Sequence, residues 1–240
     1  MLPVVQTEIV KKPMPHRPAY IFDLDGTLVD TAPDLLAATN AVLADAGRAI
    51  VDPETLRHMV GFGARSLISQ AFAATGEPAA EADLPALVDN FVSHYRQNIA
   101  AESRPFPGVE RTLAELTGTA RLGVLTNKPQ ALTDLLLPAL GLDRYFAAIH
   151  GAGRLEVAKP DARVFHHVIE ELGGPMVGSG AGAVMIGDSA TDVATARAAG
   201  VPVILVSYGY TPVPAAELGG DAVTGDFTQI PALAKKLLGG

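Results

Sequence analysis

Short apolar runs alternate with amphipathic stretches along most of this chain, from residue 19 onward. Five runs have the length and composition of strands: AYIFDL from Ala19, RLGVLT from Arg121, the less regular FAAIHG from Phe146, AVMIGD from Ala183 and VPVILVS from Val201. Amphipathic stretches with glycine stops predict helices at 129–141, 161–174 and 189–200. This alternation predicts an α/β fold whose core is a Rossmann-like parallel sheet.

One long interval lacks strands and shows only helical periodicity. Helices are expected to begin at Pro33, at Pro53 behind an Asp52 cap, at Ala64 and at Leu84. An insertion of about seventy residues is too large for a loop, so we expect an inserted all-helical cap domain. The expected division is an N-terminal tail at 1–18, an α/β core at 19–33 and 103–240, and the helical cap at 34–102.

The composition of the chain argues against several classes of protein and site. The 240 residues carry a formal charge of −8, which argues against a nucleic-acid partner, and contain no cysteine, which excludes thiolate metal sites and thiol nucleophiles. No apolar run is long enough to span a membrane, and the N-terminal residues do not resemble a signal peptide. We therefore expect a cytoplasmic protein without a membrane partner.

The first strand is followed by an acidic turn. Asp23 and Asp25 alternate with Leu24, so both carboxylates are expected on one side, and Gly26 and Thr27 turn the chain away. Taken alone, this pattern is more typical of a turn with solvated acids at the end of a strand. Two neighbouring carboxylates raise the cost of ionising each other, so a functional pair needs a compensating cation.

Further polar residues follow the other strands. Thr126 and Asn127 end the second strand, Lys159 precedes a helix, and Asp188 and Asp192 follow a third strand. In open parallel sheets ligands bind beyond the carboxyl ends of the strands, so these groups are expected to meet the aspartate pair there. GSGAGA at 178–183 precedes a strand instead of following one, which argues against a dinucleotide loop.

These residue types suit phosphoryl transfer. Carboxylates without histidine or cysteine favour a hard cation, Mg²⁺ before Zn²⁺. A hydroxyl, an amide and a lysine suit phosphoryl oxygens, and an aspartate can attack phosphorus. An aspartate that approaches a phosphate dianion is repelled by roughly 4 kcal/mol for each pair of unit charges, at a separation of ~4 Å and an effective dielectric near 20. A metal and Lys159 would offset this repulsion.

The motifs DLDGTLVD, LTNKP, AKP and IGDSATD, in this order and with this helical insertion, resemble the haloacid dehalogenase superfamily with a C1 helical cap. The cap segment GFGARSLISQAF and the late run SYGY are most similar to phosphoglycolate phosphatases. The resemblance covers nearly everything from Ala19 on. Two departures from the family pattern concern loop shape: Gly151-Ala152-Gly153 before the lysine, and Ala162 after KPD.

The resemblance implies a role for each acidic residue. Asp23 corresponds to the nucleophile, and Asp25 to the general acid and base. The metal ligands correspond to Asp23, Asp25 through its backbone carbonyl, and Asp188, with Mg²⁺ as the cofactor. Asp192 corresponds to an acid that orients metal-bound water.

The resemblance also assigns the phosphate contacts, and the position of the helical insertion beside the acidic strand end suggests a specificity loop. Thr126, the backbone at Asn127 and Lys159 correspond to phosphate-binding residues, and Lys159 also holds the nucleophile. In the cap, the loop formed by Gly61, Phe62, Gly63 and Arg65 is either an ordinary interhelical turn or a substrate contact. Arg65 is the candidate contact for a substrate carboxylate, because arginine binds a carboxylate through two parallel hydrogen bonds.

The leading hypothesis is a Mg²⁺-dependent phosphatase that hydrolyses a small phosphorylated metabolite, 2-phosphoglycolate, through an aspartyl-phosphate. Alternatives in the same superfamily are a pyrophosphatase, a sugar-phosphate phosphatase and a phosphosugar mutase. A receiver-like signalling domain or a phosphate-binding protein is the alternative from another class, although the paired aspartates and the helical insertion argue against it. The chain is expected to act as a monomer or homodimer.

Overall fold

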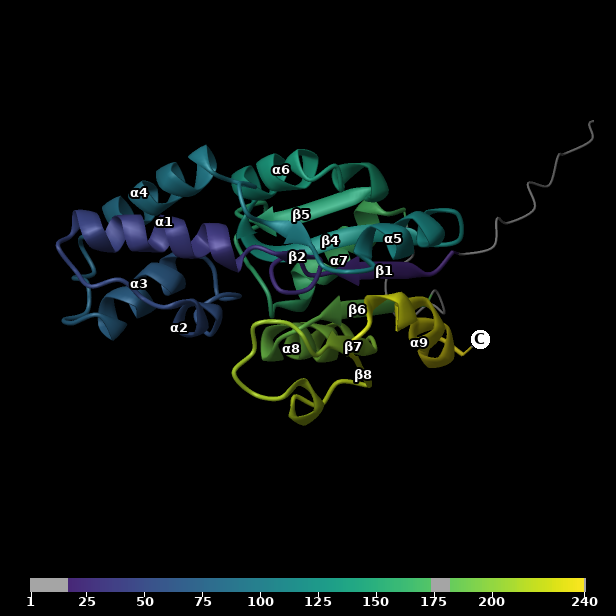
Figure 1. The fold of residues 1–240 in the computed structure, drawn as a ribbon. Coiled ribbons are helices and arrows are strands. Elements are labelled where there is room, and N and C mark those ends of the chain that lie inside the picture. The colour runs from purple at the N-terminus through teal and green to yellow at the C-terminus, as the bar shows by residue number, and fades with distance from the viewer. Residues whose placement is uncertain (1–16, 174–181, 240) are drawn as a thin grey trace, which may run out of the picture.

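The computed structural model describes residues 17–173 and 182–239 (Figure 1). Most of the expected N-terminal tail, Gly174 and most of the GSGAGA run lie outside these residues. Within the described ranges, no helix combines the length and the apolar character needed to cross a membrane.

The centre of the fold is a six-stranded sheet in which all neighbouring strands are parallel. Its spatial order is β5-β4-β1-β6-β7-β8. The strands are β1 (Ala19–Phe22), β4 (Arg121–Pro129), β5 (Ala148–Ala152), β6 (Ala183–Gly187), β7 (Val203–Val206) and β8 (Ala222–Thr224). The predicted α/β fold with a parallel sheet is confirmed.

Helices cover both faces of the sheet because its strands alternate between two apolar layers. In β1, Tyr20 and Phe22 face one layer and Ala19 and Ile21 face the other. The first layer packs against α5 (Val109–Thr117), α6 (Gln130–Ala139) and α9 (Ile230–Leu237). The second packs against α7 (Ala162–Glu171) and α8 (Ala190–Ala199).

A helical module lies to one side of the sheet (Figure 1). It consists of α1 (Ala32–Asp45), α2 (Pro53–Arg57), α3 (Ala64–Ala74) and α4 (Leu84–Gln97). These helices share an apolar core that also includes Leu132 and Tyr210 from the sheet domain. As predicted, the Asp52 side chain caps α2 by accepting from the backbone N–H groups of Glu54 and Thr55.

Two short strands connect the helical module to the sheet. Here β2 (Val29–Asp30) pairs antiparallel with β3 (Arg104–Pro105). Beside them, the buried Asp34 carboxylate accepts from the Ser103 backbone N–H at 2.8 Å and from its hydroxyl at 2.6 Å. The chain therefore leaves and re-enters the sheet domain at one place, where these hydrogen bonds hold the two connecting segments together.

Single-turn 3₁₀ helices occur at Asp143–Tyr145, Ala215–Glu217 and Phe227–Gln229.

Candidate active site

The acidic turn after β1 is held against the neighbouring strand β6. The Asp23 backbone N–H donates to the Ile186 carbonyl at 2.8 Å, which continues the ladder one residue beyond the strand. Gly26 then has a φ of +81°, and a Cβ there would lie 2.6 Å from the Asp188 carboxylate. Only glycine accommodates both this backbone conformation and this close approach. The turn is thereby placed directly on the acid that follows β6.

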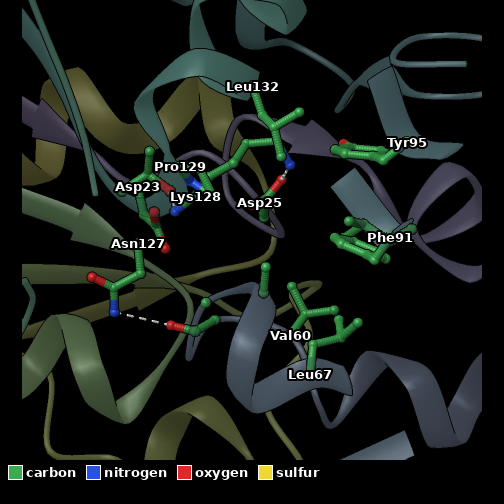
Figure 2. Close-up of a pocket in the computed structure, with 15 residues that line it drawn as sticks. Asp23, Asp25, Val60, Leu67, Phe91, Tyr95, Asn127, Lys128, Pro129 and Leu132 are labelled. Atoms are coloured by element: carbon green, nitrogen blue, oxygen red, sulfur yellow. Dashed lines mark hydrogen bonds and ion pairs between the residues drawn. The ribbon is translucent and has the colours of Figure 1, made fainter. Parts of the chain in front are cut away.

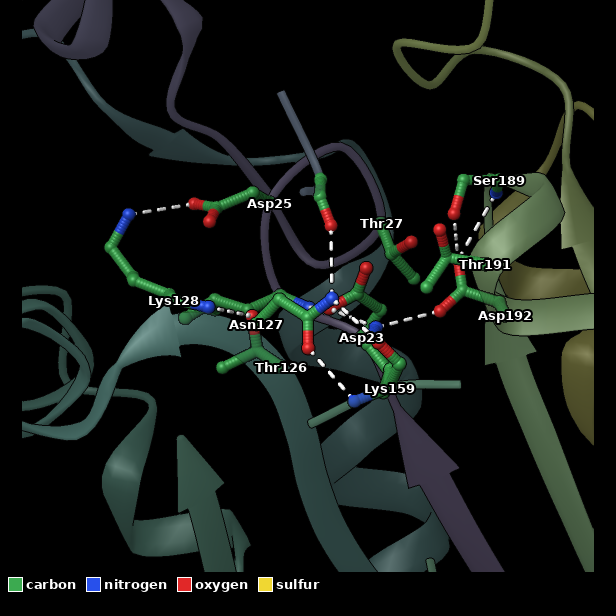
Figure 3. Close-up of polar contacts among 12 residues, drawn as sticks. Asp23, Asp25, Thr27, Thr126, Asn127, Lys128, Lys159, Ser189, Thr191 and Asp192 are labelled. Atoms are coloured by element: carbon green, nitrogen blue, oxygen red, sulfur yellow. Dashed lines mark hydrogen bonds and ion pairs between the residues drawn. The ribbon is translucent and has the colours of Figure 1, made fainter. Parts of the chain in front are cut away.

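Lys159 joins two of the predicted acidic residues. Its buried ammonium lies 2.9 Å from Asp23 Oδ1 and 2.7 Å from Asp192 Oδ1 (Figure 3). Burial opposes the charged form, but the two carboxylates outweigh it and raise the pKa of Lys159 above its ordinary value. The lysine is therefore a fixed positive charge at the end of the sheet.

The carboxylates of Asp23, Asp188 and Asp192 form a buried cluster. One oxygen from each lies within 4.8 Å of the others. Burial is the main cause that raises the pKa of Asp23 to about 7 and that of Asp188 to about 8, and repulsion by Asp192 adds to both. Such a cluster favours a bound cation, which stabilises the charged carboxylates.

The charge balance and donor set of this region fit a divalent metal. Four carboxylates, those of the cluster and of Asp25, face two buried lysines, Lys128 and Lys159. One divalent cation would compensate the two negative charges that remain. The ligand atoms offered by the cluster are all carboxylate oxygens, the type that Mg²⁺ prefers.

Both carboxylate oxygens of Asp192 accept hydrogen bonds from other residues of the protein. Its Oδ1 binds Lys159, and its Oδ2 accepts from the Asp188 backbone N–H at 3.2 Å and from the Ser189 hydroxyl at 2.7 Å. With Ser189 it forms a capping box at the start of α8. Gly187 leaves room for it, because a Cβ there would lie 2.3 Å from its carboxyl carbon. Asp192 therefore positions Lys159 and the Asp188 backbone.

Asp188 is oriented from two sides. Its Oδ1 accepts from the Thr27 hydroxyl at 3.0 Å, and its Oδ2 accepts from the Tyr210 backbone N–H at 2.8 Å. The Tyr210 hydroxyl in turn donates to Asp30 Oδ1 at 2.6 Å. This network links the acid cluster to the base of the helical module, and it was not predicted because Tyr210 lies far from Asp30 in the sequence.

Asp25 lines the same cavity as Asp23, as the alternation suggested, but it binds a different lysine. The β1 ladder ends earlier, and Asp25 lies in the turn, where its Oδ1 accepts from Lys128 at 2.9 Å (Figure 3). The same oxygen accepts from the Thr31 hydroxyl at 2.7 Å. The Lys128 ammonium also lies 4.5 Å from the centre of the Tyr95 ring. Each aspartate of the pair is therefore neutralised by its own lysine.

Lys128 is a site residue that the sequence reasoning missed. A signal was present in the sequence: Lys128 follows Thr126 by two residues, and β4 continues through both positions. Alternation along a strand places such residues on one face. Thr126, Asn127 and Lys128 all line the same cavity as the aspartate pair.

This cavity lies between the sheet and the helical module. It contains about 450 Å³ of space, part of which is open to solvent, with Asp23 and Asp25 on the sheet side and Val60, Leu67 and Phe91 on the helical side (Figure 2). A cavity that is polar on the sheet side and apolar on the helical side suits a small ligand with one strongly charged group.

The cap loop meets the sheet domain through Asn127. The side-chain amide of Asn127 donates to the Gly61 carbonyl at 3.2 Å, and its Oδ1 accepts from the Lys159 backbone N–H at 3.0 Å. Gly61 and Gly63 line the cavity. Asn127 therefore connects the predicted specificity loop to the predicted phosphate-binding segment.

The other two loop residues lie elsewhere. Phe62 is 58% exposed and lines a neighbouring cavity with Asp188 and Tyr210. Arg65 forms an ion pair with Glu81 on the surface and is not among the residues that line the cavity above Asp23. Its predicted contact with a substrate carboxylate remains a prediction, and it requires Arg65 to leave Glu81.

This chain is similar to haloacid dehalogenase-like hydrolases along most of its length, because a model of that family matches residues 20–206. A phosphoglycolate phosphatase from Agrobacterium fabrum is 46% identical over 93% of this chain and 95% of that protein. One from Caulobacter vibrioides is 46% identical over 90% of each chain. The crystal structure of a predicted phosphoglycolate phosphatase from Haemophilus somnus 129PT matches with a TM-score of 0.84 at 29% identity, covering 92% of this chain and 99% of that one.

Proposed function

The chain belongs to the haloacid dehalogenase-like hydrolases and is a phosphoric monoester hydrolase, and we propose that it hydrolyses 2-phosphoglycolate to glycolate and phosphate. The substrate is proposed from the relatives, which carry the name phosphoglycolate phosphatase at 46% identity. A cavity with one densely charged end is compatible with a ligand as small as this one. We place the enzyme in the cytoplasm, as a monomer or homodimer.

The observation that best supports the chemistry is the environment of Asp23. Its Oδ1 accepts from the Leu24 backbone N–H at 2.7 Å and from Lys159 at 2.9 Å. Both contacts hold the carboxylate in one orientation at the edge of the cavity. We propose that the remaining oxygen, Oδ2, attacks the phosphorus and that the products are an aspartyl-phosphate and the released alcohol.

Asp25 supplies the proton transfers in this proposal. It would donate a proton to the leaving oxygen, and its carboxylate would then take a proton from the water that hydrolyses the aspartyl-phosphate. Lys128 and the Thr31 hydroxyl hold Asp25 Oδ1 at the wall of the cavity. Thr126, the Asn127 backbone and Lys159 would bind the phosphoryl oxygens.

Asp23, Asp188 and the backbone carbonyl of Asp25 would hold Mg²⁺. When bound, this cation supplies positive charge that offsets the repulsion between Asp23 and the phosphate oxygens. Asp192 would act through its neighbours by orienting Asp188 and Lys159. The loop of Gly61, Phe62, Gly63 and Arg65 remains the proposed specificity element.

A panel of phosphate esters tests this function. Phosphate release would be measured with Mg²⁺ for 2-phosphoglycolate, a sugar phosphate, pyrophosphate and p-nitrophenyl phosphate. We expect the highest kcat/KM for 2-phosphoglycolate, no turnover by Asp23→Asn, and normal turnover by the exposed control Asp143→Asn. A higher kcat/KM for pyrophosphate or a sugar phosphate would contradict the proposed substrate, and binding without turnover would contradict the proposed chemistry.

A further inference from the structure

A second group of metal-binding side chains lies away from the acid cluster, between the edge strand β5 and the helix α7. One ligand atom each from His150, His167 and Glu171 lies within 4.8 Å of the others. His167 and Glu171 are one helical turn apart, and His167 Nε2 lies 3.4 Å from Glu171 Oε1. The His150 ring meets the His167 ring with centroids 5.3 Å apart and planes at 74°. Three potential ligands from two elements therefore converge on one point.

His150 contributes to this group a buried imidazole with a ring nitrogen that is unsatisfied within the described ranges. His150 is only 2% exposed, and its Nδ1 atom is buried without a hydrogen-bond partner among the described residues. Buried polar atoms are rarely left unpartnered.

We propose that His150, His167 and Glu171 form a second divalent-metal site, selective for Zn²⁺ and similar borderline cations and separate from the site at Asp23. Two imidazoles and one carboxylate are a known zinc ligand set, in which solvent completes the coordination. Mg²⁺ prefers oxygen ligands and would remain at the acid cluster. Ligand atoms around a tetrahedral Zn²⁺ lie roughly 3.3 Å apart, given metal–ligand distances of about 2.0–2.2 Å, so ligand atoms that now lie within 4.8 Å of one another must approach by up to about 1.5 Å.

Arg154 competes with a cation for this site. Its guanidinium donates to Glu171 Oε1 at 2.5 Å, to Glu171 Oε2 at 3.2 Å and to the Ile149 carbonyl at 2.8 Å. Zn²⁺ must displace at least one of the bonds to Glu171, and the positive charge of Arg154 repels it. Removing this arginine should therefore strengthen Zn²⁺ binding, whereas removing a ligand should weaken it.

The site would connect β5 to the carboxyl end of α7. This helix starts at Ala162, with Asp161 as its cap, only a few residues after Lys159. Zn²⁺ would thus tie the edge of the sheet to the helix that follows the active-site lysine. A ligand that binds only the folded chain raises Tm, on the order of 5–10 °C at a hundredfold excess over Kd.

The proposal is tested by titrating Zn²⁺ into the untagged full chain in saturating Mg²⁺, with isothermal calorimetry and Tm as the readouts. We expect one Zn²⁺ site in the wild type. His167→Gln and Glu171→Gln should weaken it by at least ~10-fold, Arg154→Gln should tighten it, and the adjacent control His166→Gln should leave it unchanged. Both ligand variants replace partly exposed side chains, and Mg²⁺-dependent turnover should show that they remain folded.

Three outcomes would overturn the proposal. The first is that the wild type takes up no Zn²⁺ once Mg²⁺ is saturating. The second is that His166→Gln weakens Zn²⁺ binding as much as His167→Gln does. The third is that Arg154→Gln weakens binding as Glu171→Gln does, because Arg154 would then support the site instead of competing for it.

Discussion

Lys128 is expected to stabilise the folded chain mainly by neutralising Asp25, so Lys128→Met should be strongly destabilising. The ammonium lies 2.9 Å from Asp25 Oδ1, and the two side chains are only 2% and 11% exposed. At this distance and an effective dielectric near 20, the attraction is roughly 6 kcal/mol before desolvation is subtracted. Removing one partner of a buried pair costs about 3–5 kcal/mol. Methionine also removes the cation–π contact between the ammonium and the Tyr95 ring, so a double-mutant cycle is needed to isolate the part of the loss that belongs to Asp25.

The assay is a double-mutant cycle measured by urea unfolding. Lys128→Met should lower the free energy of unfolding by about 3–5 kcal/mol. In an Asp25→Asn background the same substitution should cost much less, with a coupling energy on the order of 2–3 kcal/mol. The exposed control Lys235→Met should stay within about 0.5 kcal/mol of the wild type. Additive losses, or a Lys128→Met effect no larger than that of the control, would refute the reasoning.

Three further predictions concern the metal and the cap. Mg²⁺ should activate and EDTA should abolish turnover, whereas Ca²⁺, which tolerates bidentate carboxylates, should engage both Asp23 oxygens and inhibit; equal rates with both ions would contradict this. Because the raised pKa values of Asp23 and Asp188, about 7 and about 8, mean that the folded metal-free chain keeps protons that the unfolded chain releases, its stability should fall between about pH 4 and pH 8. Mg²⁺ should therefore raise Tm more at pH 8 than at pH 5, and equal shifts would argue against a shared metal site. Arg65→Ala should lower kcat/KM for 2-phosphoglycolate but not for p-nitrophenyl phosphate; if neither changes, Lys128 becomes the candidate for the carboxylate contact.

The convergence of the polar groups could be predicted because it follows from parallel strands. Phe22 is level with Val124 on one side and Ile186 on the other, so the residues after these positions emerge at one edge. This register alone predicts that Asp23, Thr126 and Asp188 lie close together, whatever the conformation of the loops. The longer helices were predictable for a similar reason, since apolar spacing and proline or glycine ends are local signals.

Features that depend on distant contacts could not be predicted. Strands β2 and β3 have two residues each and β8 has three, which is too short for a periodic signal. The helices α5 and α9 were not predicted either. The ion pair of Arg65 with Glu81 depends on how the cap helices pack, and the Tyr210–Asp30 bond joins positions 180 residues apart. Sequence alone indicated the chemistry at the sheet edge but not the side chains that orient it.

The central claim is that Asp23 carries the phosphoryl group while Asp25 moves protons, and Asp25→Asn tests it most directly. Asparagine keeps the backbone carbonyl and an oxygen for Lys128 but cannot transfer a proton. p-Nitrophenolate needs little acid assistance, so the first step should survive, whereas hydrolysis of the aspartyl-phosphate should slow by roughly 10²–10⁴-fold.

The measurement is a rapid-quench reaction of Asp25→Asn with p-nitrophenyl phosphate and Mg²⁺, followed by mass spectrometry of the digested chain. The predicted result is one equivalent of nitrophenolate released in a burst, with the phosphate on the peptide that contains Asp23 and none on that peptide in Asp23→Asn. If both aspartates were only metal ligands, there would be no burst and no trapped phosphate. Phosphate on a different residue, or normal turnover by Asp23→Asn, would contradict the account.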